Sequence, residues 1–159
     1  MREKKFLDTV HGYISVPETY CDKLVDTRYF QRLRRIEQTS ARSLFPCARH
    51  DRFVHSLGVF HLGRKIVASI LRQVEIPEPL KHTFQIACLL HDCGHSPFSH
   101  TLEELFGTRE ELFEAYKQEI HDRKLDVRIA DVDIADKAYD TKQHEILSAL
   151  LSVTFFYER

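Results

Sequence analysis

Apolar residues recur at helical spacing along most of the chain, and the breaks in this pattern mark the predicted turns. The clearest stretch begins at Phe53 and lasts until the helix-stopping sequence Pro77-Glu78-Pro79. Its inward positions are Leu57, Phe60, Gly63, Val67, Ile70 and Leu71. Residues 80–90 are apolar on several sides, which predicts a second helix buried at the centre of the domain.

Shorter elements are predicted before these two helices. Pro17 stands where one helix can begin, and Thr27 can cap another. The inward positions of these two helices are Leu24, Val25, Phe30, Leu33 and Ile36. Residues 40–51, with Pro46 in the middle, predict a loop, and no strand ladder emerges anywhere. The expected class is therefore all-α.

The C-terminal third combines capped helices with charged segments. Thr108 and Glu111 have capping-box spacing ahead of one helix, and Asp140 and Gln143 have similar spacing ahead of the final one. The predicted inner stripe of that final helix is Leu147, Leu150, Leu151 and Thr154. Since residues 121–140 are strongly charged, we expect the segment 107–140 to be an insertion or an exposed excursion.

The chain ends on an apolar cluster, VTFFY at residues 153–157, two residues before Arg159. An apolar terminus normally packs on something. We therefore expect one domain over residues 1–159 whose C-terminal side is cut short. Either the natural protein continues there, or a partner chain, such as a second copy in a homo-oligomer, covers this end.

Composition indicates an ordinary globular domain inside the cell. A chain of 159 residues is about one domain, and 43% hydrophobic with 30% charged residues is usual for one. No apolar run is long enough for a membrane span, and the N-terminus lacks a secretory signal. The four cysteines show no CxxC spacing, which argues against a cysteine zinc site or a disulfide scaffold. A reducing, cytoplasmic setting fits best.

Arginines are concentrated in one segment. Seven arginines and no lysine lie between Thr27 and Arg52, against only Glu37 and Asp51. The planar guanidinium group suits bidentate binding of phosphate. The alternative for any one of them is a solvated helix face with internal ion pairs. The cluster as a whole favours an anionic ligand.

The ten histidines carry the candidate chemistry, and the dipeptide His91-Asp92 has the most informative context. It follows the apolar stretch 80–90 and meets a glycine-containing turn at residues 93–99. A carboxylate at the end of a buried helix is costly unless it is paired, so its partner is a metal or, alternatively, an arginine. His55 does not lie on the most apolar face of its own helix, so its side chain can point across a groove towards His91.

Two imidazoles and a carboxylate suit iron, manganese, nickel or zinc, with magnesium as a further option. Three other histidines follow in the sequence, namely His95, His100 and His144. They can serve as proton donors or phosphate ligands, because histidine titrates near neutral pH. Taken singly, each could equally be structural.

Together these motifs resemble the dNTP triphosphohydrolase branch of the HD-domain phosphohydrolases. Residues 52–59 (RFVHSLGV) and 91–100 (HDCGHSPFSH) resemble the two HD motifs of that branch. Residues 8–14 (DTVHGYI), 30–38 (FQRLRRIEQ) and 144–145 (HE) resemble further motifs of the family, in the same order.

The resemblance implies a role for each candidate residue. His55, His91 and Asp92 correspond to metal ligands, Arg52 to a phosphate contact, and Gln38 to the position that reads the sugar. The residues that would line the phosphates or act in catalysis are His95, His100 and His144. The implied fold is the helical bundle of an HD domain.

The implied reaction is metal-dependent hydrolysis of a dNTP to a deoxynucleoside and triphosphate. Water would attack the α-phosphorus, Arg52 and the metal would stabilise the developing charge, and His100 or His144 would protonate the leaving 5′-oxygen. Three alternatives stay open. They are an HD phosphodiesterase or nuclease acting on another nucleotide or on single-stranded nucleic acid, a non-catalytic nucleotide-binding HD fragment, and a purely structural helical domain.

The chain departs from the family pattern at the fourth metal ligand. In the family this ligand is an aspartate on a later helix, and the present sequence reaches Arg159 before any such motif. Asp131, Asp133 and Asp136 precede His144, so they do not occupy the equivalent place. We expect a longer natural protein or a second chain to complete the site.

Overall fold

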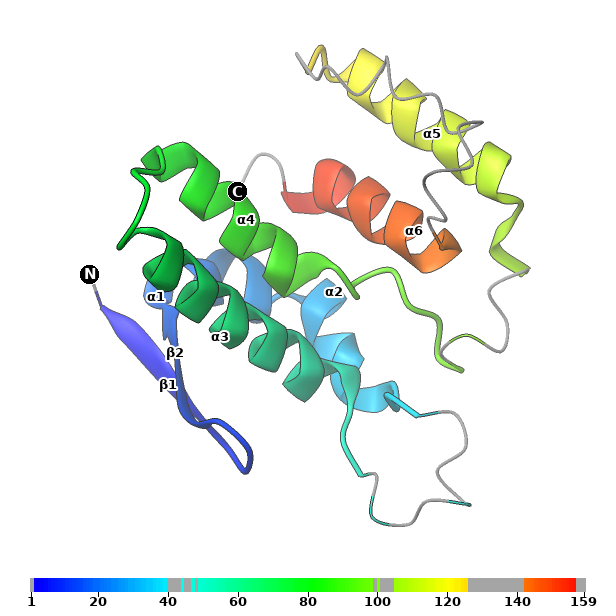
Figure 1. Cartoon of the computed structure of the whole chain (residues 1–159). Helices are drawn as coiled ribbons and strands as arrows, with labels where there is room; N and C mark the ends of the chain where they lie inside the picture. The colour runs from blue at the N-terminus through cyan, green and yellow to red at the C-terminus, as the bar shows by residue number, and fades with distance from the viewer. Residues whose placement is uncertain are drawn as a thin grey trace.

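The computed structural model describes residues 2–39, 44, 47, 49–98, 100, 105–125 and 142–156. Helices dominate this part of the chain, as the sequence predicts (Figure 1). The elements in chain order are β1 (Glu3–Asp8), β2 (Gly12–Pro17), α1 (Glu18–Tyr20), η1 (Cys21–Val25), α2 (Arg28–Gln31), η2 (Arg32–Arg35), α3 (Arg52–Ile70), α4 (Glu78–Leu90), α5 (Arg109–Asp122), α6 (Gln143–Leu151) and η5 (Ser152–Phe156).

The N-terminal hairpin corrects the expectation that the chain has no strand ladder. β1 and β2 pair antiparallel, with Glu3 opposite Pro17 and Asp8 opposite Gly12. The only alternating buried positions of the hairpin are Ile14 and Val16 in β2, so the alternation is too short to stand out from the charged residues around it.

The hairpin turn is closed by a local hydrogen-bond pattern. The carboxylate of Asp8 accepts the backbone N–H groups of Val10 and His11, each at 2.8 Å. Gly12 has a φ of 70°, which is the left-handed conformation that favours glycine. The hairpin packs beside α3 through β2 (Figure 1).

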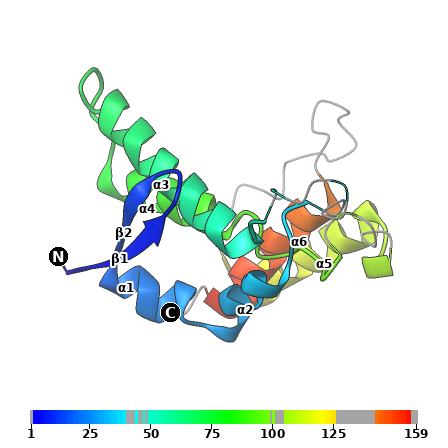
Figure 2. The same ribbon diagram turned by 90° about the horizontal axis from the view of Figure 1, so that it is seen from below.

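α3 and α4 form an antiparallel pair at the centre of the molecule (Figures 1 and 2). Asp51 begins α3 by accepting the N–H group of Val54 at 2.9 Å. The two helices approach closely at Gly63, where an added Cβ atom would lie only 2.7 Å from Cys88 Sγ. The absence of a side chain at Gly63 therefore sets the separation of the two helices.

The prediction that residues 80–90 form the central buried helix is wrong in its extent. Only Leu89 and Leu90 are buried, whereas Leu80 and Phe84 are 57% and 40% exposed. Only the last turn of α4 reaches the core, because the N-terminal end of α4 projects from the body of the molecule together with the C-terminal end of α3 (Figure 2).

The core lies between the hairpin, the short helices after it, α3 and the last turn of α4. Its members are Ile14, Val16, Cys21, Leu24, Val25, Phe30, Leu33, Ile36, Phe53, Leu57, Phe60, Leu89, Leu90, Cys93 and Phe156. The inward positions predicted for the two short N-terminal helices are all among them. Thr27 caps α2 as expected, by accepting the N–H group of Phe30.

α5 and α6 lie side by side (Figure 1). The capping box of α5 is confirmed: Thr108 Oγ1 accepts the Glu111 N–H group at 3.2 Å, and Glu111 Oε2 accepts the Thr108 N–H group at 2.8 Å. The cap predicted for α6 is wrong, since Lys142 precedes the helix and donates its N–H group to Glu145 at 2.8 Å. Asp140 lies outside the described residues.

The predicted inner stripe of the last helix is also wrong. The buried positions of α6 are His144, Ile146 and Ser148. The residues expected there, Leu147, Leu150, Leu151 and Thr154, are only partly buried. The polar side of α6 faces inward because it packs on the turn after α4, where Gly94 leaves room for its backbone.

The segment 107–140 contains α5, and its residues from 126 onward lie outside the described part of the chain. Asp131, Asp133 and Asp136 lie outside that part, as does most of the predicted loop 40–51. All four cysteines carry free thiols. None of the described helices has both the length and the apolar character needed to cross a membrane.

Candidate metal centre

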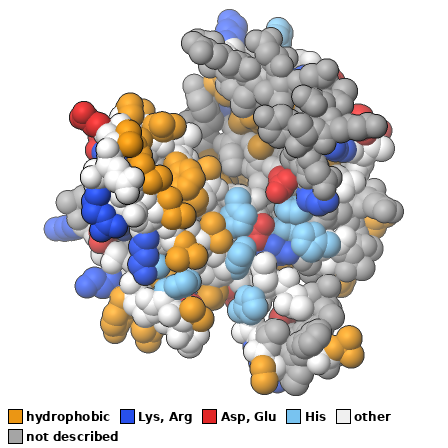
Figure 3. Space-filling model, in the orientation of Figure 1, with side chains coloured by type: hydrophobic (Ala, Val, Ile, Leu, Met, Phe, Trp, Pro, Cys, Tyr) orange, Lys and Arg blue, Asp and Glu red, His pale blue; other side chains and the backbone are white. Residues whose placement is uncertain are grey.

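The three predicted metal ligands meet at the end of the α3–α4 pair that faces the core. His55 lies in the first turn of α3, and His91 and Asp92 directly follow α4. One donor atom from each of them lies within 4.8 Å of the other two. Figure 3 shows histidine side chains gathered around acidic groups in the middle of this face.

The distances between the donor atoms fit one shared ion. His55 Nε2 lies 3.3 Å from His91 Nε2 and 3.6 Å from Asp92 Oδ2, and His91 Nε2 lies 3.4 Å from Asp92 Oδ1. Two donors that each bind an ion at about 2.1 Å lie roughly 3.0–3.4 Å apart. The observed separations are close to this range.

The protonation of the two histidines also fits a metal. His91 Nδ1 lies 2.9 Å from the Cys88 carbonyl oxygen and donates to it, so Nε2 is the ring nitrogen that faces the other candidate ligands. Burial lowers the pKa of His55, which favours its neutral, ligating form. The side chains of His55 and His91 are 33% and 35% exposed, so a ligand can approach from solvent.

Asp92 is buried and already has a cationic partner. Arg52 Nη1 donates to Asp92 Oδ2 at 2.6 Å, and both side chains are almost fully buried. Burial raises the pKa of Asp92, but the hydrogen bond from His95 and the charges of His91 and Arg52 together hold it well below its usual range. The carboxylate is therefore ionised, and the arginine partner considered from the sequence is present beside the metal candidates.

A second group of three histidines adjoins the first. The His95 and His144 rings stack with centroids 3.9 Å apart and an interplanar angle of 19°, and His100 meets both edge-on at 4.8 and 5.0 Å. One nitrogen from each ring also lies within 4.8 Å of the others. Because ring nitrogens ligate in the ring plane, two nearly parallel stacked rings cannot both aim at one ion. The group fits proton transfer better than metal binding.

The second histidine group connects the buried carboxylate to the surface. His95 is fully buried, and its Nε2 lies 3.3 Å from Asp92 Oδ1. Burial lowers the pKa of His95, which favours a neutral ring. His144 is buried beside it, whereas His100 is exposed. His100 is therefore the member of this group that solvent reaches.

Comparison with known proteins identifies the domain. Residues 52–158 match the HD domain family. This chain belongs to that family. It is 45% identical over 100 residues to the deoxynucleoside triphosphate triphosphohydrolase SAMHD1 homolog of Dictyostelium discoideum, which covers 60% of this chain and 19% of the relative. It is 39% identical over 121 residues to SAMHD1 of Danio rerio, which covers 74% and 19%. These relatives support the dNTP triphosphohydrolase branch.

A solved structure and a further relative extend the comparison. A phosphohydrolase from Bacteroides thetaiotaomicron superimposes with a TM-score of 0.64 at 27% identity, over 99% of this chain and 36% of its own. The uncharacterized protein YwfO of Bacillus subtilis is 42% identical over 113 residues, or 70% of this chain and 26% of its own. The chain spans about a fifth to a quarter of the length of its curated relatives.

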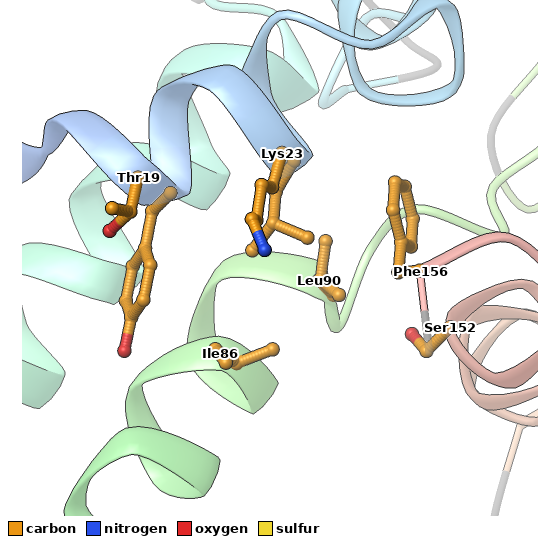
Figure 4. Close-up of a pocket in the computed structure, with 8 residues that line it drawn as sticks. Thr19, Lys23, Ile86, Leu90, Ser152 and Phe156 are labelled. Atoms are coloured by element: carbon orange, nitrogen blue, oxygen red, sulfur yellow. The ribbon is translucent and has the colours of Figure 1, made fainter. Parts of the chain in front are cut away.

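Two cavities of the HD domain differ in their relation to the site. One of about 450 Å³ lies between the hairpin turn and α3 and is bordered by His55, with Arg49 and His50 on its rim. The other, of about 500 Å³, is lined by Thr19, Tyr20, Lys23, Leu24, Ile86, Leu90, Ser152 and Phe156 (Figure 4). None of the candidate site residues lines this second cavity, whereas His55 lines the first.

Three arginines of the arginine-rich segment make different contacts in the structure. Arg52 pairs with Asp92, and Arg32 donates to the carbonyl oxygens of the turn after α4. Arg34 lies 3.6 Å from the centroid of the Phe53 ring. Arg42 lies outside the described residues, and an anionic ligand for the cluster as a whole stays a prediction.

Gln38, the candidate sugar contact, lies beside the residues that lead into α3. Its backbone N–H group donates to the His50 carbonyl oxygen at 3.1 Å. Its side-chain Oε1 is buried and accepts no hydrogen bond from the described residues. An acceptor in this state suits a ligand that carries a hydroxyl donor.

Sequence reasoning missed two residues that bear on the site, Arg32 and Ser148. Arg32 was visible only as one of seven arginines, and nothing local distinguishes it from the others. Ser148 follows His144 by four residues and therefore shares its helix face. That spacing was a usable signal, but the apolar stripe expected on α6 obscured it.

Proposed function

We propose that this HD domain is the metal- and nucleotide-binding part of an enzyme that hydrolyses dNTPs to deoxynucleosides and triphosphate. The observation that carries the proposal is that Asp92 joins the two groups: its Oδ1 lies within 3.4 Å of both His91 Nε2 and His95 Nε2, and its Oδ2 lies 3.6 Å from His55 Nε2. Similarity to proteins named deoxynucleoside triphosphate triphosphohydrolases favours dNTPs among possible phosphate esters.

His55, His91 and Asp92 would hold one divalent transition metal, for which iron, manganese, nickel and zinc are suitable ions. When bound, the ion supplies positive charge that stabilises the phosphoryl oxygens. The exposed side of the two histidines leaves room for a phosphate group. The cavity beside His55, at about 450 Å³, offers room for part of the substrate.

The remaining residues would act on the leaving group and on orientation. In this hydrolysis the bond between the α-phosphorus and the 5′-oxygen breaks, water oxygen joins the phosphorus, and the 5′-oxygen takes up a proton. We assign His100 as the donor of this proton, because it is the exposed member of its group. Arg52 Nη2, 3.4 Å from His100 Nε2, places positive charge on the same side.

The proposed part of Gln38 is to orient the sugar. The buried Oε1 atom would accept a hydrogen bond from a sugar hydroxyl group. Because Gln38 N donates to the carbonyl oxygen of His50, two residues before α3, the position of Gln38 is tied to the start of the helix that carries His55. The Gln38→Ala variant should therefore raise the KM for dNTPs more than it lowers kcat.

The test measures triphosphate release from mixed dNTPs with added Mn²⁺, together with the metal content of the purified protein. His91→Ala should lose both the metal and the release. His121→Ala is the matched control, since His121 also precedes an aspartate but lies exposed on α5. Cyclic nucleotides and single-stranded DNA, assayed in parallel, would distinguish the phosphodiesterase and nuclease alternatives. Metal and dNTP binding without release would favour the non-catalytic alternative, and a His91→Ala variant that keeps its metal would refute the site.

A further inference from the structure

The turn after α4 carries Asp92 of the metal group and His95 of the second histidine group. Its internal hydrogen bonds run from Cys93 N to Leu90 O at 3.0 Å and from His95 N to Asp92 O at 3.2 Å. These bonds leave the carbonyl oxygens of Cys93 and His95 and the N–H group of Gly94 to be satisfied. Since all three residues are buried, their partners must come from the protein or from ordered water.

Arg32 holds the two carbonyl oxygens. Its Nη1 donates to His95 O at 2.7 Å, and its Nη2 donates to Cys93 O. Burial lowers the pKa of Arg32, but a guanidinium group remains charged in proteins. Because the guanidinium group is planar and rigid, two bonds from it fix the carbonyl groups relative to each other, which a lysine cannot do.

Ser148 holds the remaining N–H group. Gly94 N donates to Ser148 Oγ at 2.8 Å, and Ser148 Oγ donates in turn to His144 O at 2.8 Å. One buried hydroxyl group thus joins the turn to the first turn of α6. The ring of His144, carried by the same turn of α6, stacks on His95 at 3.9 Å.

We propose that Arg32 and Ser148 are positioning residues of the site: Arg32 fixes Asp92 and His95 through the backbone of their turn, and Ser148 sets His144 against His95. The inference rests on the proposed function, because it assigns what keeps that site in shape. Neither side chain belongs to the candidate ligands or proton donors, so each acts through the turn. A metal site with donors 3.3–3.6 Å apart tolerates little movement of that turn.

The first experiment compares Arg32→Lys with Arg64→Lys. Arg64 also donates to a distant backbone carbonyl, Ser15 O at 2.7 Å, but far from the turn. We expect Arg32→Lys to raise the Mn²⁺ dissociation constant about 10- to 100-fold by calorimetry, with its helical circular dichroism retained. Guanidinium ion at millimolar concentration should restore part of the affinity in Arg32→Ala. Unchanged affinity in Arg32→Lys, or equal loss in Arg64→Lys, would overturn the role of Arg32.

The second experiment compares Ser148→Ala with Ser152→Ala, in which the lost hydroxyl group donates only to Ser148 O at 2.7 Å. Ser148→Ala should speed hydrogen exchange of the Gly94 amide about tenfold or more and lower kcat with little change in KM. Ser152→Ala should leave both unchanged. If no variant, nor the original protein, released triphosphate, the proposed function would fail, yet Mn²⁺ affinity and amide exchange would still decide the positioning roles. Unchanged protection of Gly94 in Ser148→Ala would overturn the role of Ser148.

Discussion

The close approach of α3 and α4 at Gly63 makes a quantitative prediction about two glycine substitutions in one helix. An added Cβ at Gly63 would lie 2.7 Å from Cys88 Sγ and 3.3 Å from Cys88 Cβ. At Gly58 its nearest neighbour would be His11 Nε2, at the end of a side chain, at 3.3 Å. Both glycines lie inside α3, so alanine gains about the same helix propensity at either position, about 1 kcal/mol.

The two variants therefore differ by the packing cost alone. Gly58→Ala should raise the free energy of unfolding by up to about 1 kcal/mol, because a mobile imidazole can give way. Gly63→Ala must move α4 or distort Cys88 by about 0.7 Å, and overpacking of this kind typically costs about 1–3 kcal/mol. Gly63→Ala should thus be less stable than Gly58→Ala by about 1–3 kcal/mol, since the propensity gain cancels.

Urea unfolding followed by circular dichroism measures this difference directly. The Cys88→Ala background supplies the control, because without Sγ the cost of Gly63→Ala should shrink. A double-mutant cycle over Gly63 and Cys88 should then show a coupling of about 1 kcal/mol or more. Equal stability of Gly58→Ala and Gly63→Ala, or a cycle without coupling, would refute the conclusion that Gly63 sets the helix separation.

Three further predictions concern other parts of the fold. Gly94→Ala should displace α6 and destabilise the protein by about 1–3 kcal/mol in urea unfolding, because the added Cβ would lie 2.5 and 2.6 Å from backbone atoms of α6. Unchanged stability of this variant would contradict the close approach of Gly94 to α6. The exposed Cys47 should react first with a thiol reagent, because burial raises the pKa of Cys21 to about 11 and of Cys93 to about 12; mass spectrometry would identify the labelled cysteine. The hydrogen bond from the backbone N–H group of His11 lowers the pKa of Asp8 below its ordinary value of 3.8. The Asp8 carboxylate therefore stabilises the fold above pH 3.8, and this stabilisation is lost as the pH falls below that value. Asp8→Asn should remove this part of the acid sensitivity in urea titrations from pH 5 to pH 3.

The sequence was sufficient to predict the fold class because the strongest helical signals are local. The helix after Asp51 and the capping box at Thr108 each depend on residues a few positions apart. The hairpin was missed because only Ile14 and Val16 alternate clearly, and the turn depends on a backbone conformation at Gly12. The inner face of α6 was predicted wrongly because its polar residues are buried by a distant turn, which apolar periodicity does not indicate.

The candidate ligands could be found from the sequence because His55, His91 and Asp92 stand in recognisable motifs. The residues around them could not be ranked in the same way. The sequence does not indicate that Arg52 pairs with a buried carboxylate or that Arg32 pairs with two carbonyl oxygens. That difference arises from contacts between residues at least 40 positions apart, which only the folded structure reveals.

The ion pair between Arg52 and Asp92 has a consequence for the order of assembly. A buried carboxylate without a counter-ion favours the unfolded state, so a metal site that lacks another cationic partner needs its metal in order to fold. Here Arg52 already balances the charge at 2.6 Å. Folding can therefore precede metal loading, and a chelator should empty the centre while the helices stay folded.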